Sequence, residues 1–132
     1  MHRFWRRPMH INKFRISSTA TGQVRIISQR SGLTPNLVCR MAMLSSFEAG
    51  PISGAADDTS EGQEFNAYTL FGDFQPLFID LLKYVEFGLE EFETDDTDLL
   101  ERLRLHIDRG VRQLSVRLKS PADAAELIAG SA

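Results

Sequence analysis

The segment SGLTPNLVCRMA, residues 31–42, decides the fold because it ends one helix and begins the next. Gly32 is suited to end a helix, since glycine adopts the left-handed conformation common after a helix C-terminus. Thr34 can cap the following helix, and Pro35 at its first position loses no backbone hydrogen bond. The segment therefore predicts a helix over residues 18–31, entered through Ser18 or Thr19, and a second helix from Pro35 to about Phe47.

The second helix is apolar on more than one stripe. A helix with this pattern is buried on several sides. In a domain of this size, such burial favours a partner subunit, the alternative being a central helix within one chain. The apolar residues are Leu37, Val38, Met41, Ala42, Met43 and Leu44.

Upstream of these helices, residues 13–17 (KFRIS) alternate between apolar and polar side chains, which predicts a short half-buried strand. Phe14 and Ile16 lie on one side of it, and Lys13, Arg15 and Ser17 on the other. A strand followed by two helices is the order of a ribbon-helix-helix element, in which two chains pair their strands and direct the outward side chains at DNA. Many small domains share this order, so the pattern alone does not assign a function.

Downstream, residues 48–62 are rich in Gly, Ala, Ser and Asp and read as a loop. A helix is predicted from about Phe74 to Gly88 with Asp73 as its cap, followed by an acidic connection over 90–98. The fold class is mainly α: a short N-terminal strand, a ribbon-helix-helix-like helix pair, and two longer C-terminal helices. The expected domain covers residues 13–130, preceded by a flexible basic extension over 1–12.

The last long helix is predicted over Leu99 to Lys119 by apolar residues at three-and-four spacing. The stripe contains Leu100, Leu103, Ile107, Val111, Leu114 and Leu118; Arg102, His106, Arg109, Arg112 and Arg117 are expected away from it. Gly110 costs about 1 kcal/mol relative to alanine inside a helix, so we expect a close approach to another element there. Ser120 and Pro121 begin a short terminal helix, with Asp123 in a box-like position.

Charge is segregated along the chain. Residues 1–47 carry eight basic side chains and no acidic one, whereas residues 48–132 carry seven basic and 18 acidic side chains. The total of -3 argues against indiscriminate nucleic-acid binding. A local basic face can still bind phosphates, because the Debye length is only about 8 Å at physiological salt. A solvated basic face without a partner is the alternative.

The 132 residues, 42% hydrophobic and 25% charged, are typical of one globular domain. No apolar run approaches the roughly 18 residues that span a membrane, and no signal-peptide pattern follows the basic N-terminus. Cys39 is the only cysteine, which excludes an internal disulfide and fits a reducing compartment. A cytoplasmic protein without contact to a membrane is expected.

Few residues offer chemistry. The three histidines lack metal-ligand spacing, so we expect no metal site and no cofactor. The loop carboxylates (Asp57, Asp58, Asp95, Asp96 and Asp98) read as solvating charge. Cys39 beside Arg40 is a candidate sulfur carrier, but a cysteine in an apolar helix is more often a core residue. No catalytic residue is assigned.

Four segments of the chain resemble the DndE family of the bacterial DNA sulfur (phosphorothioate) modification system. They are FRIS with TAT; SGLTPNLVCRMA; GQEFNAYTLFGDF with LFIDLLK; and HIDRGVRQLSVRLKS, and together they span about Phe14 to Ser120. GQEFNAYTLFG is the most distinctive of them. Because the resemblance begins shortly after Met9, Met9 is a second candidate for the translation start.

The resemblance implies a small, mainly helical, non-enzymatic protein that assembles as a homotetramer and prefers nicked duplex DNA. It also implies work beside a cysteine desulfurase, an ATP-pyrophosphatase-like protein and an ATPase. Basic surface residues are implied as the DNA contacts. The positions available in this sequence are Lys13, Arg15, Arg25, Arg30, Arg40, Arg109, Arg112, Arg117 and Lys119.

Two other functions are considered. A ribbon-helix-helix transcriptional regulator would read base edges through Lys13, Arg15 and Ser17. A catalytic role would use Cys39 as a sulfur relay, or would make the chain a nicking enzyme, for which the sequence offers no metal or nucleophile constellation.

Overall fold

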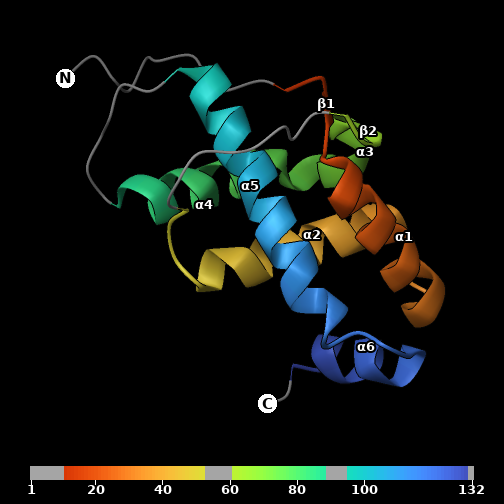
Figure 1. Ribbon diagram of the computed structural model, residues 1–132. Coiled ribbons are helices and arrows are strands. Elements are labelled where there is room, and N and C mark those ends of the chain that lie inside the picture. Colours follow the sequence, from red (N-terminus) through yellow and green to blue (C-terminus); the bar gives the residue numbers. More distant parts are fainter. Residues whose placement is uncertain (1–10, 53–60, 89–94, 131–132) are drawn as a thin grey trace.

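The computed structural model describes residues 11–52, 61–88 and 95–130. Its mainly helical architecture, with a short N-terminal strand, confirms the predicted fold class (Figure 1). In chain order the elements are β1 (Lys13–Arg15), α1 (Ser18–Ser31), α2 (Pro35–Glu48), β2 (Glu64–Asn66), α3 (Ala67–Phe71), the 3₁₀ helix η2 (Gly72–Phe74), α4 (Gln75–Phe87), α5 (Asp96–Ser115) and α6 (Pro121–Ile128).

The junction between α1 and α2 forms as predicted. Gly32 has a φ of 81°, and its amide donates to the Ser28 carbonyl at 3.0 Å. Thr34 caps α2 by accepting a hydrogen bond from the Leu37 amide at 3.3 Å, and Pro35 occupies the first turn. The cap of α1 is Ser17 rather than Ser18 or Thr19, because the Ser17 hydroxyl accepts from the Ala20 amide at 3.0 Å.

The strand β1 pairs with β2 of the same chain, a partner that the sequence did not predict. The pairing is antiparallel and places Phe14 opposite Phe65, with both side chains buried and their ring centroids 6.3 Å apart. Beside this pair, the Ala67 amide donates to the Asn12 carbonyl at 2.8 Å, and Ile11 is buried. The packed fold therefore includes Ile11, two residues before the expected domain boundary.

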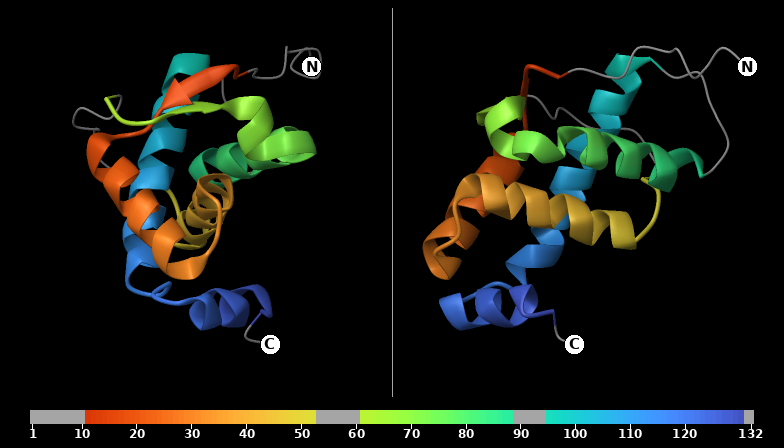
Figure 2. Two further views of the ribbon diagram at one scale, coloured as in Figure 1. Left: turned by 90° about the vertical axis from the view of Figure 1, so that its right-hand side faces the viewer. Right: turned by 180° about the vertical axis from the view of Figure 1, so that it is seen from behind.

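Helices α2 and α5 cross at Gly110, which confirms the predicted close approach (Figure 2). A Cβ atom at Gly110 would lie 1.8 Å from the carbonyl oxygen of Ala42, a separation that no side chain can occupy. Ala42 is itself fully buried. The missing side chain thus sets the distance between the two helices.

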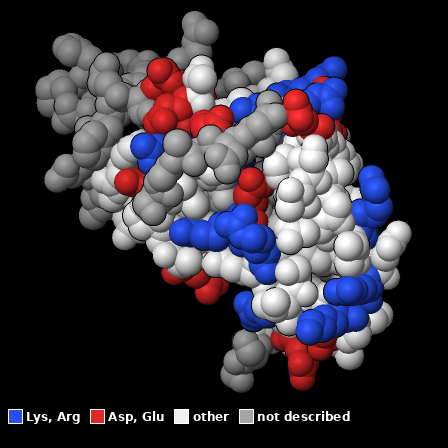
Figure 3. Space-filling model, in the orientation of Figure 1, with Lys and Arg blue, Asp and Glu red and all other residues white. Residues whose placement is uncertain are grey.

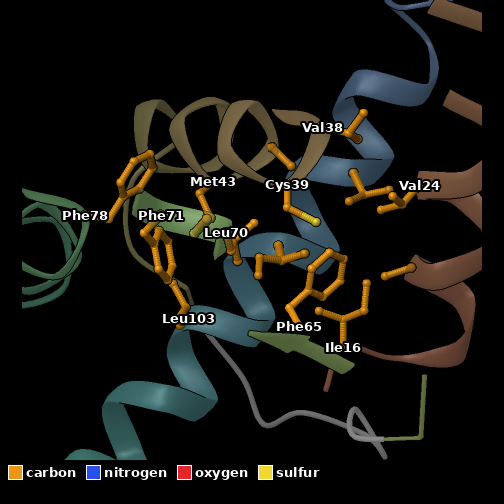
Figure 4. Packing of buried hydrophobic residues seen from close by; sticks show 14 of the residues in the cluster. Ile16, Val24, Val38, Cys39, Met43, Phe65, Leu70, Phe71, Phe78 and Leu103 are labelled. Carbon is orange, nitrogen blue, oxygen red and sulfur yellow. The ribbon is translucent and has the colours of Figure 1, made fainter. Parts of the chain in front are cut away.

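Helix α2 lies in the middle of the core. Figure 4 shows Val38, Cys39 and Met43 of α2 among buried side chains from the other elements. These neighbours are Ile16, Val24 from α1, Phe65 from β2, Leu70 and Phe71 from α3, Phe78 from α4 and Leu103 from α5. Of the two alternatives, a partner subunit or a central helix within one chain, the second accounts for the side of α2 that carries Val38, Cys39 and Met43.

The boundaries of the later helices differ from prediction. Asp73 does not cap α4; it lies in η2, and the N-cap position of α4 is Phe74. Helix α5 begins at Asp96, because Asp95 caps it by accepting from the Asp98 amide at 2.7 Å, and it ends at Ser115 rather than Lys119. Part of the acidic connection is thus a helix N-terminus, where negatively charged side chains interact favourably with the positive end of the helix dipole.

Candidate nucleic-acid interface

Two segments of the fold carry basic side chains and no acidic ones. Residues 13–31, which form β1 and α1, contain four basic residues, and residues 109–119 at the end of α5 contain four more. Neither segment contains an Asp or Glu. Each is therefore a source of local positive potential in a chain whose net charge is -3.

The fold brings these two segments to the same side of the molecule. The Ser17 hydroxyl donates to Oδ1 of Asp108 at 2.9 Å, and Nε of Arg104 donates to the Arg15 carbonyl at 2.9 Å. These bonds fix the start of α1 against the middle of α5. In Figure 3, Lys and Arg side chains form separate groups near the strand pair, over α1 and over the lower half of α5, with Asp and Glu side chains beside the strand pair and near the centre of the same face.

Seven of the nine predicted DNA contacts lie on the surface. All are exposed residues, and none belongs to the hydrophobic core. Lys13 and Arg15 point outward from β1 because Phe14 between them is buried. The exposed residues are Lys13, Arg15, Arg25, Arg30, Arg112, Arg117 and Lys119.

Arg15 has partners within the chain. Its Nη1 donates to the Gly62 carbonyl at 3.0 Å, and its Nη2 lies 3.4 Å from Oε1 of Glu64. These contacts orient the guanidinium beside the strand pair. Since both residues remain exposed, the ion pair with Glu64 is a weak competitor for a phosphate group.

Arg40 and Arg109, the other two predicted contacts, direct guanidinium hydrogen bonds into the fold. Nε of Arg40 donates to the Leu70 carbonyl, and its guanidinium carbon lies 5.9 Å from the centroid of the Phe74 ring. Both residues are half-buried. Their hydrogen bonds give them structural roles, whereas the seven exposed residues present their charge to the solvent.

The guanidinium of Arg109 binds the chain that leaves α2. Nε donates to the Ser46 hydroxyl at 2.8 Å, and Nη2 donates to the Ser46 carbonyl at 2.7 Å. The carbonyls of Gly50 and Pro51 accept from Nη2 and Nη1 of the same side chain. Arg109 therefore holds the end of α2 and the following segment against α5.

A buried polar cluster lies next to Arg109. Nδ1 of His106 is 2.7 Å from the Ser46 hydroxyl, and Nε2 is 2.8 Å from Oε2 of Glu86. Glu86 also accepts from the Ile52 amide at 3.0 Å and pairs with Arg102. The prediction that His106 lies away from the apolar stripe is wrong: its side chain is fully buried between α2, α4 and α5.

The pKa values of this cluster are shifted. Burial lowers the pKa of His106 and outweighs the opposing effect of Glu86. Burial on its own would raise the pKa of Glu86, but hydrogen bonds from Ile52, His106 and Arg102 reverse this, so that it is lowered. A neutral His106 that donates from Nε2 to the Glu86 carboxylate and accepts from Ser46 satisfies every partner.

The hydrogen-bonded series Ser46, His106 and Glu86 resembles the nucleophile, base and orienting carboxylate of a catalytic triad. Both Ser46 and His106 are fully buried, so no substrate reaches the hydroxyl. The arrangement joins α2, α4 and α5 through one imidazole ring. No spacing in the sequence pointed to it, although Glu86 follows Ile79 and Leu82 on the buried side of α4.

Cys39 is a core residue. Burial raises the pKa of its thiol to about 12, so the thiolate needed for sulfur transfer is scarce at neutral pH. Among the described residues, no three His, Cys, Asp or Glu side chains lie close enough to hold a metal ion. None of the described helices is long and apolar enough to cross a membrane. Asp57 and Asp58 lie outside the described residues.

The fold matches solved structures of DndE proteins. DndE from Escherichia coli B7A, described as involved in DNA phosphorothioation modification, has 22% identity and a TM-score of 0.64, and the match covers 78% of this chain and 97% of that one. A DndE G21/24K mutant involved in DNA phosphorothioation has 19% identity and a TM-score of 0.58, with 80% and 97% covered. No curated protein matches the chain.

The family model for the DNA sulphur modification protein DndE matches residues 13–122. This range runs from β1 into α6 and contains both basic segments. The chain thus belongs to the DndE family of DNA sulphur modification proteins.

Proposed function

We propose that this chain is a non-enzymatic, DNA-binding accessory subunit of phosphorothioate modification, and that it prefers nicked duplex. The observation that carries the proposal is the packing of two acid-free basic segments, 13–31 and 109–119, on one side of the molecule. Arginine and lysine on such a face neutralise phosphates without reading sequence. Membership of the DndE family supplies the biological setting.

A preference for nicks follows from the mechanics of DNA. Bending intact duplex by 40 to 90° costs of order 1 to 6 kcal/mol, whereas a nick lets the duplex bend at little elastic cost. A basic face that contacts phosphates on both sides of a bend therefore gains affinity for nicked DNA. No contact to a base edge is needed for this preference.

The proposal includes assembly and partners. The chain is proposed to act as a homotetramer beside the cysteine desulfurase, the ATP-pyrophosphatase-like protein and the ATPase of the modification system. With a charge of -3 per chain, four copies carry a large negative total, so DNA binding must come from a concentrated basic face. The other faces remain available to proteins.

Fluorescence anisotropy of one duplex, intact and with a single nick, tests the proposal at several salt concentrations. We expect tighter binding to the nicked form. The logarithm of the association constant should fall linearly with the logarithm of the salt concentration, with a slope of about -0.9 for each phosphate contacted. Equal affinity for the two forms would remove the proposed preference. Absence of binding to both would refute the function.

Matched variants locate the contacts. Replacing Arg25 and Arg30 of α1 together by Gln should weaken binding to both duplexes and reduce the salt slope by about 2. Gln29→Ala, an uncharged and exposed position on the same helix, should leave both quantities unchanged. Sequence-specific protection of paired half-sites would instead support the ribbon-helix-helix regulator. The ribbon-helix-helix element requires the strands of two chains to pair, whereas β1 pairs with β2 of its own chain, which argues against this alternative.

A further inference from the structure

Tyr68 on α3 is the most exposed of the large apolar and aromatic side chains in the described part of the chain. Its exposed fraction is 74%, whereas Ala67, Leu70 and Phe71 of the same helix are buried. One side of α3 therefore belongs to the core, and Tyr68 lies on the other side. Single exposed rings are common on protein surfaces, so the surroundings of Tyr68 decide whether it marks a site.

Those surroundings form a pocket at one end of the strand pair. Its volume is about 350 Å³. Small-ligand sites have volumes of about 300 to 1,000 Å³, so this pocket suits one nucleotide rather than a longer segment. Apart from the buried Ile11, the lining is polar or aromatic, with one basic residue and no acidic one. We call this site the Tyr68 pocket; it is lined by Ile11, Asn12, Lys13, Asn66, Tyr68 and Gln75.

The backbone that carries Tyr68 is held by hydrogen bonds to its neighbours. The Ala67 amide donates to the Asn12 carbonyl at 2.8 Å, and Oδ1 of Asn66 accepts from the Thr69 amide at 3.1 Å. Ala67 is fully buried, and α3 lies beside the strand pair in Figure 1. The first turn of α3 is therefore fixed against the end of β1. A ring that is held in place before binding loses little conformational freedom when a flat partner stacks on it.

Lys13 brings positive charge to the pocket. It lies opposite Asn66 in the register of the strand pair, and both side chains are on the exposed face. Lys13 is also the first residue of the acid-free segment 13–31. Glu64, the acidic residue on this face of β2, is paired with Arg15 at 3.4 Å. The pocket therefore combines an aromatic ring, a cation and side-chain amides, the groups that bind a base face, a phosphate and base edges.

We propose that the Tyr68 pocket binds the nucleotide at one edge of a nick, with its base stacked on Tyr68 and its phosphate beside Lys13. The inference rests on the proposed function and names the residues that distinguish a nick from continuous duplex. In intact duplex each base is stacked and paired, so extruding one is costly. A nick removes one backbone link, so the terminal nucleotide leaves the stack more easily. Since every base has a flat face, the contact requires no particular sequence.

Two variants of Tyr68 test the stacking contact in the anisotropy assay. Tyr68→Ala should weaken binding to nicked duplex about tenfold, the order of one base–aromatic contact, and leave the affinity for intact duplex unchanged. Tyr68→Phe keeps the ring and should bind both duplexes as the wild type does; a Phe variant as weak as the Ala variant would overturn stacking. Tyr84→Ala is the matched control, because this second tyrosine is 56% exposed on α4 and does not line the pocket.

A modified duplex tests the same contact from the DNA and does not depend on the folding of a variant. An abasic residue at the edge of the nick that enters the pocket should weaken wild-type binding about tenfold, whereas one at the other edge should not. With Tyr68→Ala the abasic residue should cause no further loss, because the ring and the base act through one contact. Independent, additive losses would overturn the proposal.

The outcomes separate this pocket from the proposed function. A wild-type preference for nicks that Tyr68→Ala retains in full would overturn the pocket and leave the proposed function standing. Equal losses for both duplexes would also overturn it, because Tyr68 would then be a general DNA contact. Tight binding of dAMP, with DNA affinities insensitive to Tyr68→Ala, would assign the pocket to a free nucleotide instead. A wild type that binds both duplexes equally would refute the proposed preference, and this site with it.

Discussion

Nε2 of His106 lies 2.8 Å from Oε2 of Glu86, within a fully buried contact that joins α5 to α4. The same histidine reaches Ser46 on α2 through Nδ1 at 2.7 Å. Three helices that are distant in the sequence thus meet at one imidazole ring. Since both ionisable groups have shifted pKa values, this contact couples the stability of the fold to pH.

We expect the free energy of unfolding to decrease as the solution is acidified. The pKa of His106 is lower in the folded chain than its ordinary value of about 6.5. Its contribution to the free energy of unfolding is therefore complete above about pH 6.5 and is lost as the pH falls through the pKa of the folded chain. The lowered pKa of Glu86 acts in the same direction below about pH 4.3. Urea unfolding measured between pH 4 and 8 tests this expectation.

Asp108 opposes this trend, because burial raises its pKa despite the hydrogen bond from Ser17. The comparison that isolates the cluster is therefore wild type against Glu86→Gln at each pH. We expect the variant to be less stable by about 3 kcal/mol at pH 7, since it removes the buried carboxylate that pairs with His106 and Arg102, and only Arg102 keeps another one, Asp98. The difference should not shrink between about pH 8 and 5, because Glu86 remains ionised there and favours the protonated imidazole; it should shrink only below about pH 4.3, where Glu86 begins to protonate. A difference that is already lost above about pH 5 would contradict the coupling.

A second prediction concerns the crossing of α2 and α5. Gly110→Ala should destabilise the fold by about 1 to 3 kcal/mol, because the added Cβ would meet the Ala42 carbonyl at 1.8 Å and the helices must separate. Gly22→Ala on α1 is the matched control. A Cβ there has no atom within 4 Å, so alanine should stabilise the fold by roughly 0.5 to 1 kcal/mol. Equal effects of the two changes in thermal unfolding would argue against the close approach.

Local signals in the sequence were sufficient to predict α1, α2 and the close approach at Gly110. Gly32, Thr34 and Pro35 act within one or two turns of their own position, so their effects do not depend on the rest of the fold. A close approach at Gly110 was also indicated, because a glycine in the middle of a helix carries a cost that such an approach explains, but only the structure shows that α2 makes it.

Contacts between distant residues could not be predicted in this way. The β1–β2 pair joins residues about 50 positions apart, and no signal within either segment specifies the other as its partner. His106 was misplaced because its polar side chain is buried by partners 20 and 60 positions away. The basic residues were identified from composition, but their exposure, and the separate roles of Arg40 and Arg109, depend on the tertiary structure.

The roles of two arginines on α5 can be separated by experiment. Arg109→Lys should lower the free energy of unfolding by about 1.5 to 3 kcal/mol, because lysine cannot reproduce the fork that binds Ser46, Gly50 and Pro51. Arg112→Lys, at an exposed position one turn away, should change stability by less than about 0.5 kcal/mol. Urea denaturation measures both; similar losses would assign Arg109 no special structural role.

The last prediction concerns the thiol of Cys39. Because its pKa is about 12 and its side chain is buried, the native protein should not react with a disulfide reagent such as DTNB at pH 8, and one equivalent should react after unfolding in guanidinium. Cys39→Ala should cost about 1 to 2 kcal/mol of stability through lost packing, and DNA binding should be unchanged at a temperature where the variant is folded. A sulfur carrier behaves differently, since its thiol must be reached by a donor and its loss abolishes transfer at any stability. Rapid labelling of the native thiol, together with loss of modification in a folded Cys39→Ala variant, would therefore establish the relay and refute the non-enzymatic role.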